Sequence, residues 1–237
     1  MNRRPRALGR LPAVPSVSLP GLLGLLGLVA SLATGPVRAQ VPLLPQEVER
    51  VDVIAIERDG RELFGFDALT GRRSRLRLEL GEEVLFQQAR GRIGLVLTDR
   101  RALAVAPGTD FQELRFQLGE TAPALGLLED RVALVVTGRR ALGFVGAGGM
   151  WIEENLPPNE SLAALRVGAT VGVVTTNRRA LGLSADRSTF VEEKLGIHET
   201  VETVSARDSI VTLRTDRRIL VFSAAQALWS EQDRRLR

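Results

Sequence analysis

Paired arginines recur along the sequence and are the side chains best suited to binding chemistry. Each pair lies in a short segment that we call a hexad, and the hexads begin at the evenly spaced positions Thr98, Thr137, Thr176 and Thr215. A guanidinium group presents a planar fork of donors that suits phosphate and carboxylate. The pattern therefore indicates a candidate site for a small anion or a glycan. Its predicted ligand-binding residues are Arg101, Arg140, Arg179 and Arg218.

Glutamates recur with the same period and give the arginines a structural interpretation. One set falls in a predicted turn between the third and fourth strands of each repeat, and another lies two positions after an aromatic residue. A feature that recurs in every repeat is more often architecture than a site, so we favour arginines that are neutralised by glutamates. The turn set is Glu82, Glu83, Glu120, Glu160 and Glu199, and the second set is Glu113, Glu153, Glu192 and Glu231.

No catalytic constellation is visible among the remaining residues. The sequence has no cysteine, which excludes thiol catalysis, disulfides and thiolate metal sites. His198 is the only histidine, and we expect an exposed turn residue there. Glu153-Glu154 and Glu192-Glu193 are interpreted as solvated pairs, and Gly146 to Gly149 as a blade loop that joins two strands. The sequence predicts no enzyme activity, no cofactor and no metal.

The elements that carry the arginines form repeats of about 39 residues, a period typical of propeller blades. An apolar run such as Val132 to Val136 predicts a first strand buried on both faces, and the hexad supplies a hairpin turn. A second strand alternates bulky and small residues, a third opens with an aromatic residue, and a fourth is more polar. A weaker first copy of the hexad, Arg58 to Leu63, begins one position more than a full period before Thr98. The predicted repeats are residues 53–91, 92–130, 131–169, 170–208 and 209–232.

Four strands in each repeat describe a propeller blade. The sequence therefore predicts an all-β fold, a five-bladed β-propeller. The last repeat ends after its third strand, so we expect an N-terminal strand within residues 41–52 to complete the last blade, in one of two registers. An open β-solenoid and an incomplete propeller that dimerises are alternatives, and we favour the closed ring.

The N-terminal segment, residues 1–39, predicts a secretory signal peptide. Arginines precede an apolar stretch from Leu19 to Ala33, and small residues place the cleavage after Ala39; a retained N-terminal anchor is the alternative. Of the 32 basic residues, five lie in this leader, which leaves 27 against 28 acidic residues in the β-propeller domain, residues 40–237. A neutral domain lacks the positive field that nucleic acid requires, so we expect no nucleic-acid partner. The signal peptide predicts that the protein is periplasmic or secreted.

The first repeat resembles a known family. The segment Arg58 to Arg72 contains Asp67-Ala68-Leu69-Thr70-Gly71, which is similar to the blade repeat of quinoprotein-type (PQQ-like) and WD-repeat-like β-propellers. The resemblance holds at the level of the blade only. Quinoprotein dehydrogenases have more blades, calcium-binding acids and adjacent cysteines, so no cofactor residue is carried over to this chain. Non-enzymatic relatives are periplasmic assembly scaffolds, and the resemblance implies such a role.

Three functions remain open at this stage. The first is an exported, non-enzymatic module that binds a protein partner. The second is a propeller that binds a small anion or glycan through the hexad arginines, and the third is a hydrolase or lyase with acids that the repeat conceals. Residues that break the symmetry, such as the loop of Gly146 to Gly149 and Pro157-Pro158, would mark a unique active site and so distinguish the third function from the first two.

Overall fold

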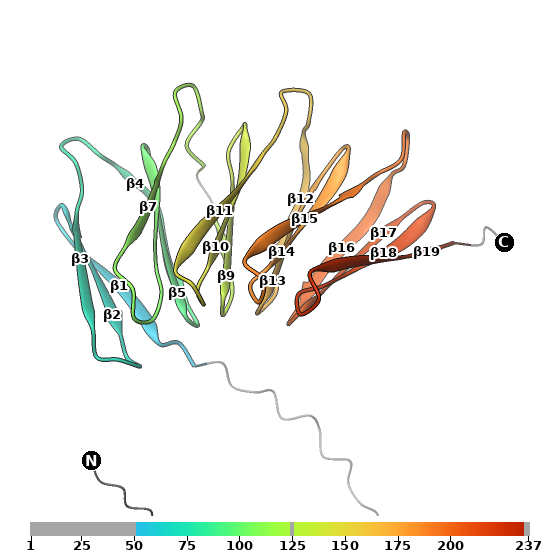
Figure 1. Ribbon diagram of the computed structural model, residues 1–237. Helices are drawn as coiled ribbons and strands as arrows, with labels where there is room; N and C mark the ends of the chain where they lie inside the picture. The colour runs from blue at the N-terminus through green and yellow to red at the C-terminus, as the bar shows by residue number, and fades with distance from the viewer. Residues whose placement is uncertain (1–50, 124–125, 235–237) are drawn as a thin grey trace, which may run out of the picture. The chain divides into compact units, whose positions relative to one another are not determined.

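The computed structural model describes residues 51–123 and 126–234, and every regular element in these ranges is a β-strand (Figure 1). The signal peptide and its cleavage site lie outside the described residues and stay predictions, and most of the segment predicted to close the last blade lies outside them too. The described residues contain no helix with the length and apolar character needed to cross a membrane.

The strands form antiparallel sheets that follow one another along the chain, and the five-bladed, all-β architecture predicted from the sequence is confirmed. The first sheet has three strands and each of the other four has four. The first two sheets are β1 (Ile54–Asp59), β2 (Glu62–Asp67) and β3 (Arg73–Arg77), then β4 (Val84–Arg90), β5 (Ile93–Thr98), β6 (Arg101–Val105) and β7 (Gln112–Arg115). The third is β8 (Leu127–Leu128), β9 (Val132–Val136), β10 (Arg140–Val145) and β11 (Met150–Asn155). The last two are β12 (Leu162–Val167), β13 (Val171–Thr176), β14 (Arg179–Ser184) and β15 (Thr189–Lys194), then β16 (Val201–Arg207), β17 (Ile210–Thr215), β18 (Arg218–Ser223) and β19 (Leu228–Asp233).

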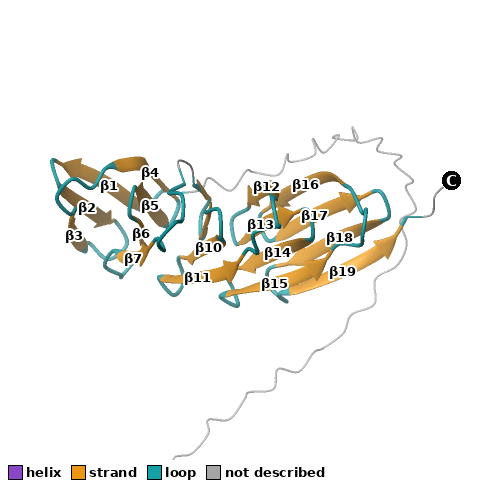
Figure 2. Ribbon diagram, turned by 90° about the horizontal axis from the view of Figure 1, so that it is seen from above, coloured by secondary structure: helices purple, strands orange, loops and turns teal. Residues whose placement is uncertain are grey.

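The polar strand of each repeat pairs with the repeat that follows it. The strand β4 pairs with β5 through a hairpin at Gly91, and β16 pairs with β17 in the same way (Figure 2). The last sheet consequently has four strands, all from residues 201–233, whereas the first sheet has three. The expectation that the last blade needs an N-terminal strand is therefore wrong in this respect, because its edge position is already filled by β16. Among the described residues, the sheet that is one strand short is the first.

Four apolar clusters hold consecutive sheets together. The alternation predicted for the second strand of each repeat is confirmed, since the bulky side chains of β10, Leu142 and Phe144, pack towards the second sheet while Ala141 packs towards the fourth. The small positions allow close approach: a Cβ built on Gly143 would lie 2.6 Å from Leu183 of the next sheet. Such bulky-on-small packing fills the space between twisted sheets at the density of a protein interior.

The first strands of the three middle repeats are buried along almost their whole length, as their apolar runs predict. All residues of β5 and β13 are buried, and β9 is buried except at its end. These strands lie between two neighbours in their own sheet and between two adjacent sheets, so alternation of polar and apolar residues would place polar groups in a core.

The hydrogen bonds of the first repeat show which of its residues correspond to those of the next repeat. They differ by one position from the correspondence that the hexad sequences suggest. The amide of Leu78 donates to the carbonyl of Arg61, and the amide of Phe116 donates to that of Arg100 in the next sheet. Arg61 therefore corresponds to Arg100, and the position of Arg101 is taken in the first sheet by Glu62. The hexad that begins at Arg58 would instead match Arg61 with Arg101, and this match is wrong.

Candidate functional site: the arginines at the turn end of the sheets

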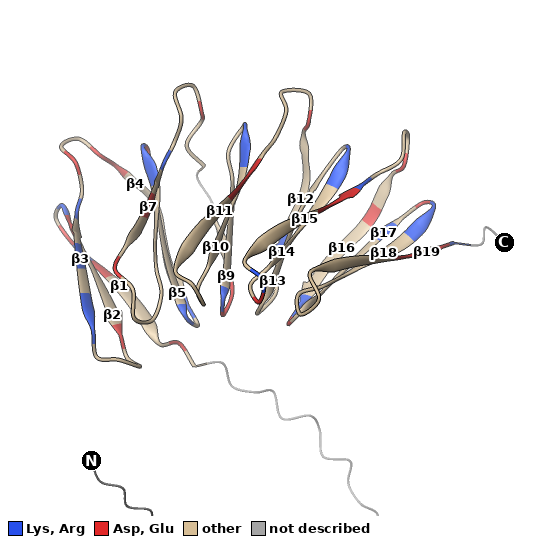
Figure 3. Ribbon diagram, viewed as in Figure 1, with Lys and Arg blue, Asp and Glu red and all other residues tan. Residues whose placement is uncertain are grey.

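The hexad arginines lie at one end of the sheets. The hairpin turns between the first and second strands of each repeat emerge there, beside the turns that lead from one sheet to the next (Figure 1). We call this end the turn end. Figure 3 shows basic residues at the tips of these hairpins and acidic residues in the adjacent turns. The turns that lead to the next sheet are residues 79–82, 117–120, 157–160 and 196–199.

Arg140 illustrates how the second arginine of each hexad is held. Its Nε donates to Glu120 Oε1 at 2.8 Å, and a second nitrogen donates to Glu120 Oε2. Its Nη1 donates to Glu153 on β11, and Nη2 also donates to the carbonyl of Arg115, at the end of β7 in the preceding sheet, at 3.2 Å. One guanidinium group therefore joins its own sheet, the preceding sheet and the turn between them.

The same arrangement recurs in the other three hexads, and we call these residues the clamp arginines. Each binds the glutamate of the preceding turn, the glutamate of its own third strand and a backbone carbonyl of the preceding sheet. The sets are Arg101 with Glu82, Glu113 and the Arg77 carbonyl; Arg179 with Glu160, Glu192 and the Asn155 carbonyl; and Arg218 with Glu199, Glu231 and the Lys194 carbonyl.

Two further glutamates take part in the later junctions. Glu154 on β11 accepts from Arg179 at 3.1 Å, and Glu193 on β15 accepts from Arg218 at 3.0 Å. Each therefore reaches across to the following sheet. The interpretation of Glu153-Glu154 and Glu192-Glu193 as simple solvated pairs is wrong, because all four carboxylates bind a clamp arginine.

The turn glutamate is the centre of each clamp. Glu120 accepts from the amide of Gln117 at 2.6 Å and from the hydroxyl of Thr137 at 2.7 Å, in addition to Arg140. Burial opposes ionisation, but the hydrogen bonds from Arg140, Gln117 and Thr137 outweigh it and lower the pKa of Glu120 to about 2. The same balance lowers the pKa of Glu82 and of Glu199.

The arginine and the turn glutamate of each clamp are largely buried, whereas the third-strand glutamate is partly exposed. The side chain of Arg140 is 4% exposed and that of Glu120 is 0% exposed. Hydrogen bonds to Glu120 and Glu153 raise the pKa of Arg140 above its usual value, because they outweigh burial, which acts in the opposite direction. A buried ion pair of this kind is costly to break, because removal of one partner leaves an uncompensated charge. The geometry agrees with the structural interpretation of the repeated arginines and glutamates.

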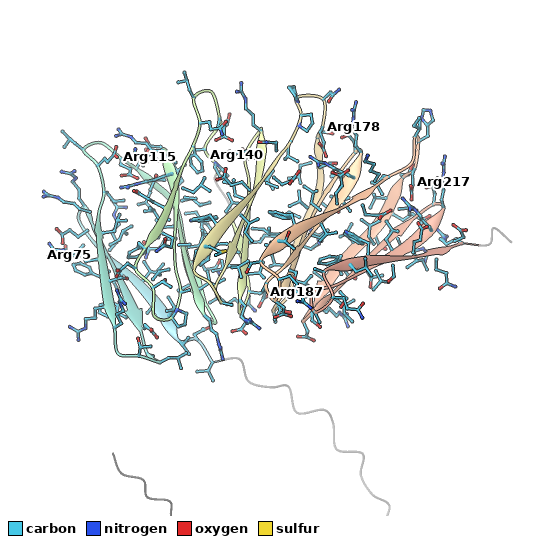
Figure 4. The ribbon with its side chains drawn as sticks, viewed as in Figure 1. Arg75, Arg115, Arg140, Arg178, Arg187 and Arg217 are labelled. Atoms are coloured by element: carbon cyan, nitrogen blue, oxygen red, sulfur yellow. The ribbon has the colours of Figure 1, made fainter. Side chains whose placement is uncertain are left out.

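The first arginine of each hexad is exposed at the turn end, and we call these residues the outer arginines: Arg100, Arg139, Arg178 and Arg217. Arg100 pairs with Glu79 at 3.1 Å. Among the described residues, Arg139 and Arg178 form no ion pair, and Arg217 donates to the carbonyl of Ile197 at 3.1 Å. In Figure 4, Arg178 and Arg217 extend from the turn end, whereas Arg187 lies at the opposite end.

Exposed apolar residues accompany the outer arginines, and of these the sequence singled out only Pro158, as a break in the symmetry. The structure places Pro158 at the same turn position as its counterparts in the other repeats, so it does not mark a unique site. These apolar residues occupy the second position of each turn between sheets, two residues before the turn glutamate. We call them the tip residues: Leu80, Leu118, Pro158 and Ile197. The exposed fractions of Leu80, Leu118 and Ile197 are 80%, 99% and 83%. The signal that could have revealed them is an aliphatic residue or proline at a fixed place before each turn glutamate.

The other sequence candidates have structural roles. His198 is exposed, as expected, and has a φ of 63°, at the turn position that glycine takes in two of the other turns. Gly146 to Gly149 form the turn between β10 and β11, at the end opposite the turn end. Trp151 and Trp229 connect sheets, since their indole nitrogens donate to the carbonyls of Gln112 (3.2 Å) and Val191 (2.9 Å) in the preceding third strands.

The residues that resemble a PQQ-like repeat form a structural turn at the opposite end. The carboxylate of Asp67 accepts from the amides of Leu69 (2.9 Å) and Thr70 (3.3 Å) and from that of Gly108 (2.8 Å) in the second sheet. Burial is outweighed by these bonds and by the hydroxyl of Thr70, so the pKa of Asp67 is lowered. A depression of about 380 Å³ adjoins this turn.

No group of three or more histidine, cysteine, aspartate or glutamate side chains in residues 51–123 and 126–234 is arranged to hold a metal ion. The charged groups that gather at the turn end are instead the alternating arginines and glutamates of the clamps.

No family model and no curated protein matches the sequence. Solved β-propeller structures resemble it at low identity. They include HIRA(644-1017), with 11% identity over 76% of this chain and 56% of that chain at a TM-score of 0.37. Prp20p from Saccharomyces cerevisiae has 7% identity over 73% and 55% at 0.40, and AztD from Citrobacter koseri has 9% over 76% and 59% at 0.39. The chain thus spans somewhat more than half of each. The resemblance to PQQ-like repeats stays a prediction.

Proposed function

We propose that this chain is an exported, non-enzymatic β-propeller module that binds a protein partner at its turn end. The observation that carries the proposal is the row of highly exposed tip residues beside outer arginines. Aliphatic side chains that are 80% to 99% exposed gain nothing from the fold itself. Exposed apolar groups flanked by cations are typical of surfaces that become buried in a complex.

The clamps support a scaffold rather than an enzyme. Catalysis by paired carboxylates requires an acid and a base whose environments differ. The carboxylates at the turn end recur with the same partners in successive junctions, and Glu82, Glu120 and Glu199 share a lowered pKa. Groups that are held as anions by buried arginines serve poorly as proton donors near neutral pH.

The alternative function, binding of a small anion or glycan by Arg101, Arg140, Arg179 and Arg218, is less favoured by the geometry. Their guanidinium donors already bind carboxylates and backbone carbonyls. A ligand would have to displace a glutamate whose side chain is 0% to 2% exposed in each clamp. No observation on these residues favours that exchange.

Site-specific photo-crosslinking in the cells that produce the protein tests the proposed partner. A photoreactive amino acid replaces Leu118 or Ile197 in one pair of variants. In the matched controls it replaces Leu69 or Leu228, which are 58% and 55% exposed at the opposite end. We expect protein adducts from the tip positions and few from the controls. Equal adduct formation at both ends, or none at the tips, would contradict a turn-end partner.

Export is tested separately. The N-terminal residue of the purified protein should be Gln40, and the protein should be recovered outside the cytoplasm. A chain that retains Met1 and remains in the cytoplasm would overturn the proposed export without affecting the binding surface.

A further inference from the structure

The first sheet leaves uncovered a face that the preceding sheet covers in every later repeat. The bulky residues of each later second strand pack on small residues of the preceding sheet, and a Cβ built on Gly182 would lie 2.7 Å from the ring of Phe222. Phe66 stands at the position of Phe222 four repeats earlier, and Phe64 is its neighbour on the same face. Among the described residues, these two side chains belong to none of the four apolar clusters. They are partly exposed, and we call this surface the leading face.

The last sheet leaves uncovered the opposite kind of face, which we call the trailing face. Ile219 and Val221 alternate on β18 with Leu220 and Phe222, which pack on the fourth sheet, so they point away from it. They too lie outside the four clusters of the described residues. On the first strand of the same sheet, Ile210 is 49% exposed, whereas the residues at its position in the three middle repeats are 0% exposed.

The leading face and the trailing face lie at the two ends of the row of sheets, with three sheets between them (Figure 1). The apolar clusters of the described residues join consecutive sheets only, and none of them joins the last sheet to the first. A leading face and a trailing face that cover each other must therefore belong to two copies of the chain.

A series of backbone hydrogen bonds at the end opposite the turn end shows what the two faces offer each other. In each junction, an amide of one sheet donates to a carbonyl of the next at 2.8 Å: Val53 to Gly91, Arg92 to Asp130, Arg131 to Ala169 and Thr170 to Asp208. Among the described residues the series stops there, and the amide of Ser209 is next in line as a donor. The carbonyl of Asp52, one repeat before Gly91, is the acceptor at the other end. Docking of a trailing face on a leading face would extend the series by this bond.

Charged residues of the two faces match in the same register. Leu97 and Val135 belong to one apolar cluster across the junction of the second and third sheets. The residues at their positions on the trailing and leading faces are Arg214 and Glu57, which are exposed and opposite in charge. Arg214 pairs with Glu202 of its own sheet at 2.9 Å, so a glutamate of a second copy would complete a three-membered cluster.

Arg73 adds a donor to the leading face at a position where later sheets have a tryptophan. Arg73 pairs with Phe66 as Trp229 pairs with Phe222, and its guanidinium lies over the Phe66 ring at 5.7 Å. The indole of Trp229 donates to the Val191 carbonyl of the preceding third strand at 2.9 Å. The guanidinium of Arg73 is able to donate in the same way to a carbonyl on β19 of a second copy.

We propose that the leading face binds the trailing face of a second copy of this chain, head to tail. Phe66 packs on Val221, and Glu57 pairs with Arg214. Because Val221 is bulkier than the glycine at its position in the fourth sheet, the two copies lie farther apart than two sheets of one chain. The mixture of apolar and charged groups is typical of surfaces between chains. Such a head-to-tail interface closes a ring of copies where the rotation between them allows it.

The inference corresponds to the alternative of an incomplete propeller that dimerises. It uses the two end faces of the row of sheets and is independent of the partner proposed at the turn end.

Light scattering of the purified protein and of variants blocked at one face tests the inference. Ala55→Arg blocks the leading face, because Ala55 is exposed and stands at the position of Gly94, where a Cβ would lie 2.4 Å from Ile56 of the preceding sheet. Ile210→Arg blocks the trailing face. The control is Met150→Arg on the third sheet, where Met150 is 46% exposed. We expect the unchanged protein and the control to have the mass of two or more chains and each blocked variant to have the mass of one.

A mixture of the two blocked variants tests the head-to-tail direction. Ala55→Arg keeps an intact trailing face and Ile210→Arg keeps an intact leading face, so equal amounts of the two should form a complex of two chains. Glu57→Arg is a second variant of the leading face. It places a cation against Arg214 and should weaken association about tenfold, which corresponds to roughly 1.4 kcal/mol. Thermal melting establishes that each variant folds.

Three results would overturn the inference. The first is a single-chain mass for the unchanged protein at its highest soluble concentration; a larger loss of melting temperature in Ala55→Arg than in Met150→Arg would then show that the same chain covers its own leading face. The second is a two-chain mass for either blocked variant alone, which would mean that like faces bind each other. The third is a mixture of the blocked variants that stays monomeric.

Discussion

At the position of the clamp arginine, the first sheet carries a charge opposite to that of the four sheets that follow it. In the later sheets a clamp arginine binds a glutamate on its own third strand, as Arg101 binds Glu113. In the first sheet Glu62 takes the arginine position and Arg75 takes that of the glutamate, and the two form an ion pair. The side chain of Arg75 is 66% exposed, whereas that of Arg101 is 6% exposed.

The difference shows that the clamp belongs to the junction between two sheets rather than to the sheet itself. Each clamp arginine donates to a carbonyl of the preceding sheet and to the glutamate of the preceding turn. Among the described residues no sheet packs before the first one, and the sequence has Leu43 at the position one repeat before Glu82. An arginine at position 62 would find neither partner among the described residues.

The largest expected effect comes from breaking one clamp. Arg140→Met removes the cation and leaves Glu120 buried without its main partner, so we expect a loss of about 3–5 kcal/mol in the free energy of unfolding. The control is Arg75→Met in the first sheet, where the ion pair is exposed and screened by solvent, so we expect a much smaller loss. Urea denaturation of both variants measures the comparison. Similar losses would show that the clamp is no stronger than a surface pair.

Acid should act on the clamps through their glutamates. The pKa of Glu120 is lowered to about 2 in the folded protein from an unperturbed 4.5, so its stabilisation is complete above pH 4.5 and is lost as the pH falls towards 2. One such group corresponds to roughly 3 kcal/mol, since a unit of pKa is worth about 1.4 kcal/mol. Denaturation midpoints across this pH range measure the loss. Glu120→Gln should be less stable at neutral pH and should show a smaller dependence on acid, and an unchanged dependence would contradict the assignment.

A smaller effect should follow from filling the close contact between the fourth and fifth sheets. A Cβ on Gly182 would lie 2.7 Å from the ring of Phe222, which is fully buried. Gly182→Ala therefore forces the sheets apart, and we expect a cost of about 1–3 kcal/mol. Gly138→Ala is the control, because nothing lies within 4 Å of its Cβ position. Thermal melting of the two variants should separate them, and equal melting temperatures would show that the junction is compliant.

The smallest effect is expected from giving the first sheet the charges of the others. Glu62→Arg combined with Arg75→Glu preserves the ion pair in reverse, and no preceding turn supplies a third partner among the described residues. We expect the free energy of unfolding to stay nearly unchanged, because an exposed ion pair is screened by solvent in either orientation. A marked stabilisation in the same denaturation assay would mean that another sheet covers this position in solution.

The period carries most of the fold. The evenly spaced hexads predict the hairpins, the buried first strands and the bulky and small faces of the second strands, because each of these depends on residues close in sequence. The partner of the polar strand could not be predicted, since β4 lies between two strands with which it could pair and the choice depends on the hairpin at Gly91. The register of the first repeat was missed because Arg61 imitates a hexad arginine, whereas burial of Leu63 fixes the alternation.

The candidate site was predictable in part. The period indicates that arginines and glutamates meet, and the structure confirms their pairing in four junctions. The sequence does not reveal which arginine of each pair is buried, because that depends on the alternation of side chains across the hairpin. Arg140 points between two sheets, and Arg139, its neighbour, points to solvent.

The even spacing of the hexads also means that a deletion or duplication of one repeat leaves the hexads intact. Deletion of residues 140–178 would join Arg139 to Arg179 and regenerate an intact hexad. The turn of residues 117–120 would then meet Arg179 in place of Arg140, with Glu192 in place of Glu153. Because each clamp uses a turn glutamate, a third-strand glutamate and a carbonyl of the preceding sheet, shortening or duplication by one unit would reproduce the same kinds of clamp contact. We therefore expect the number of sheets to change by whole repeats.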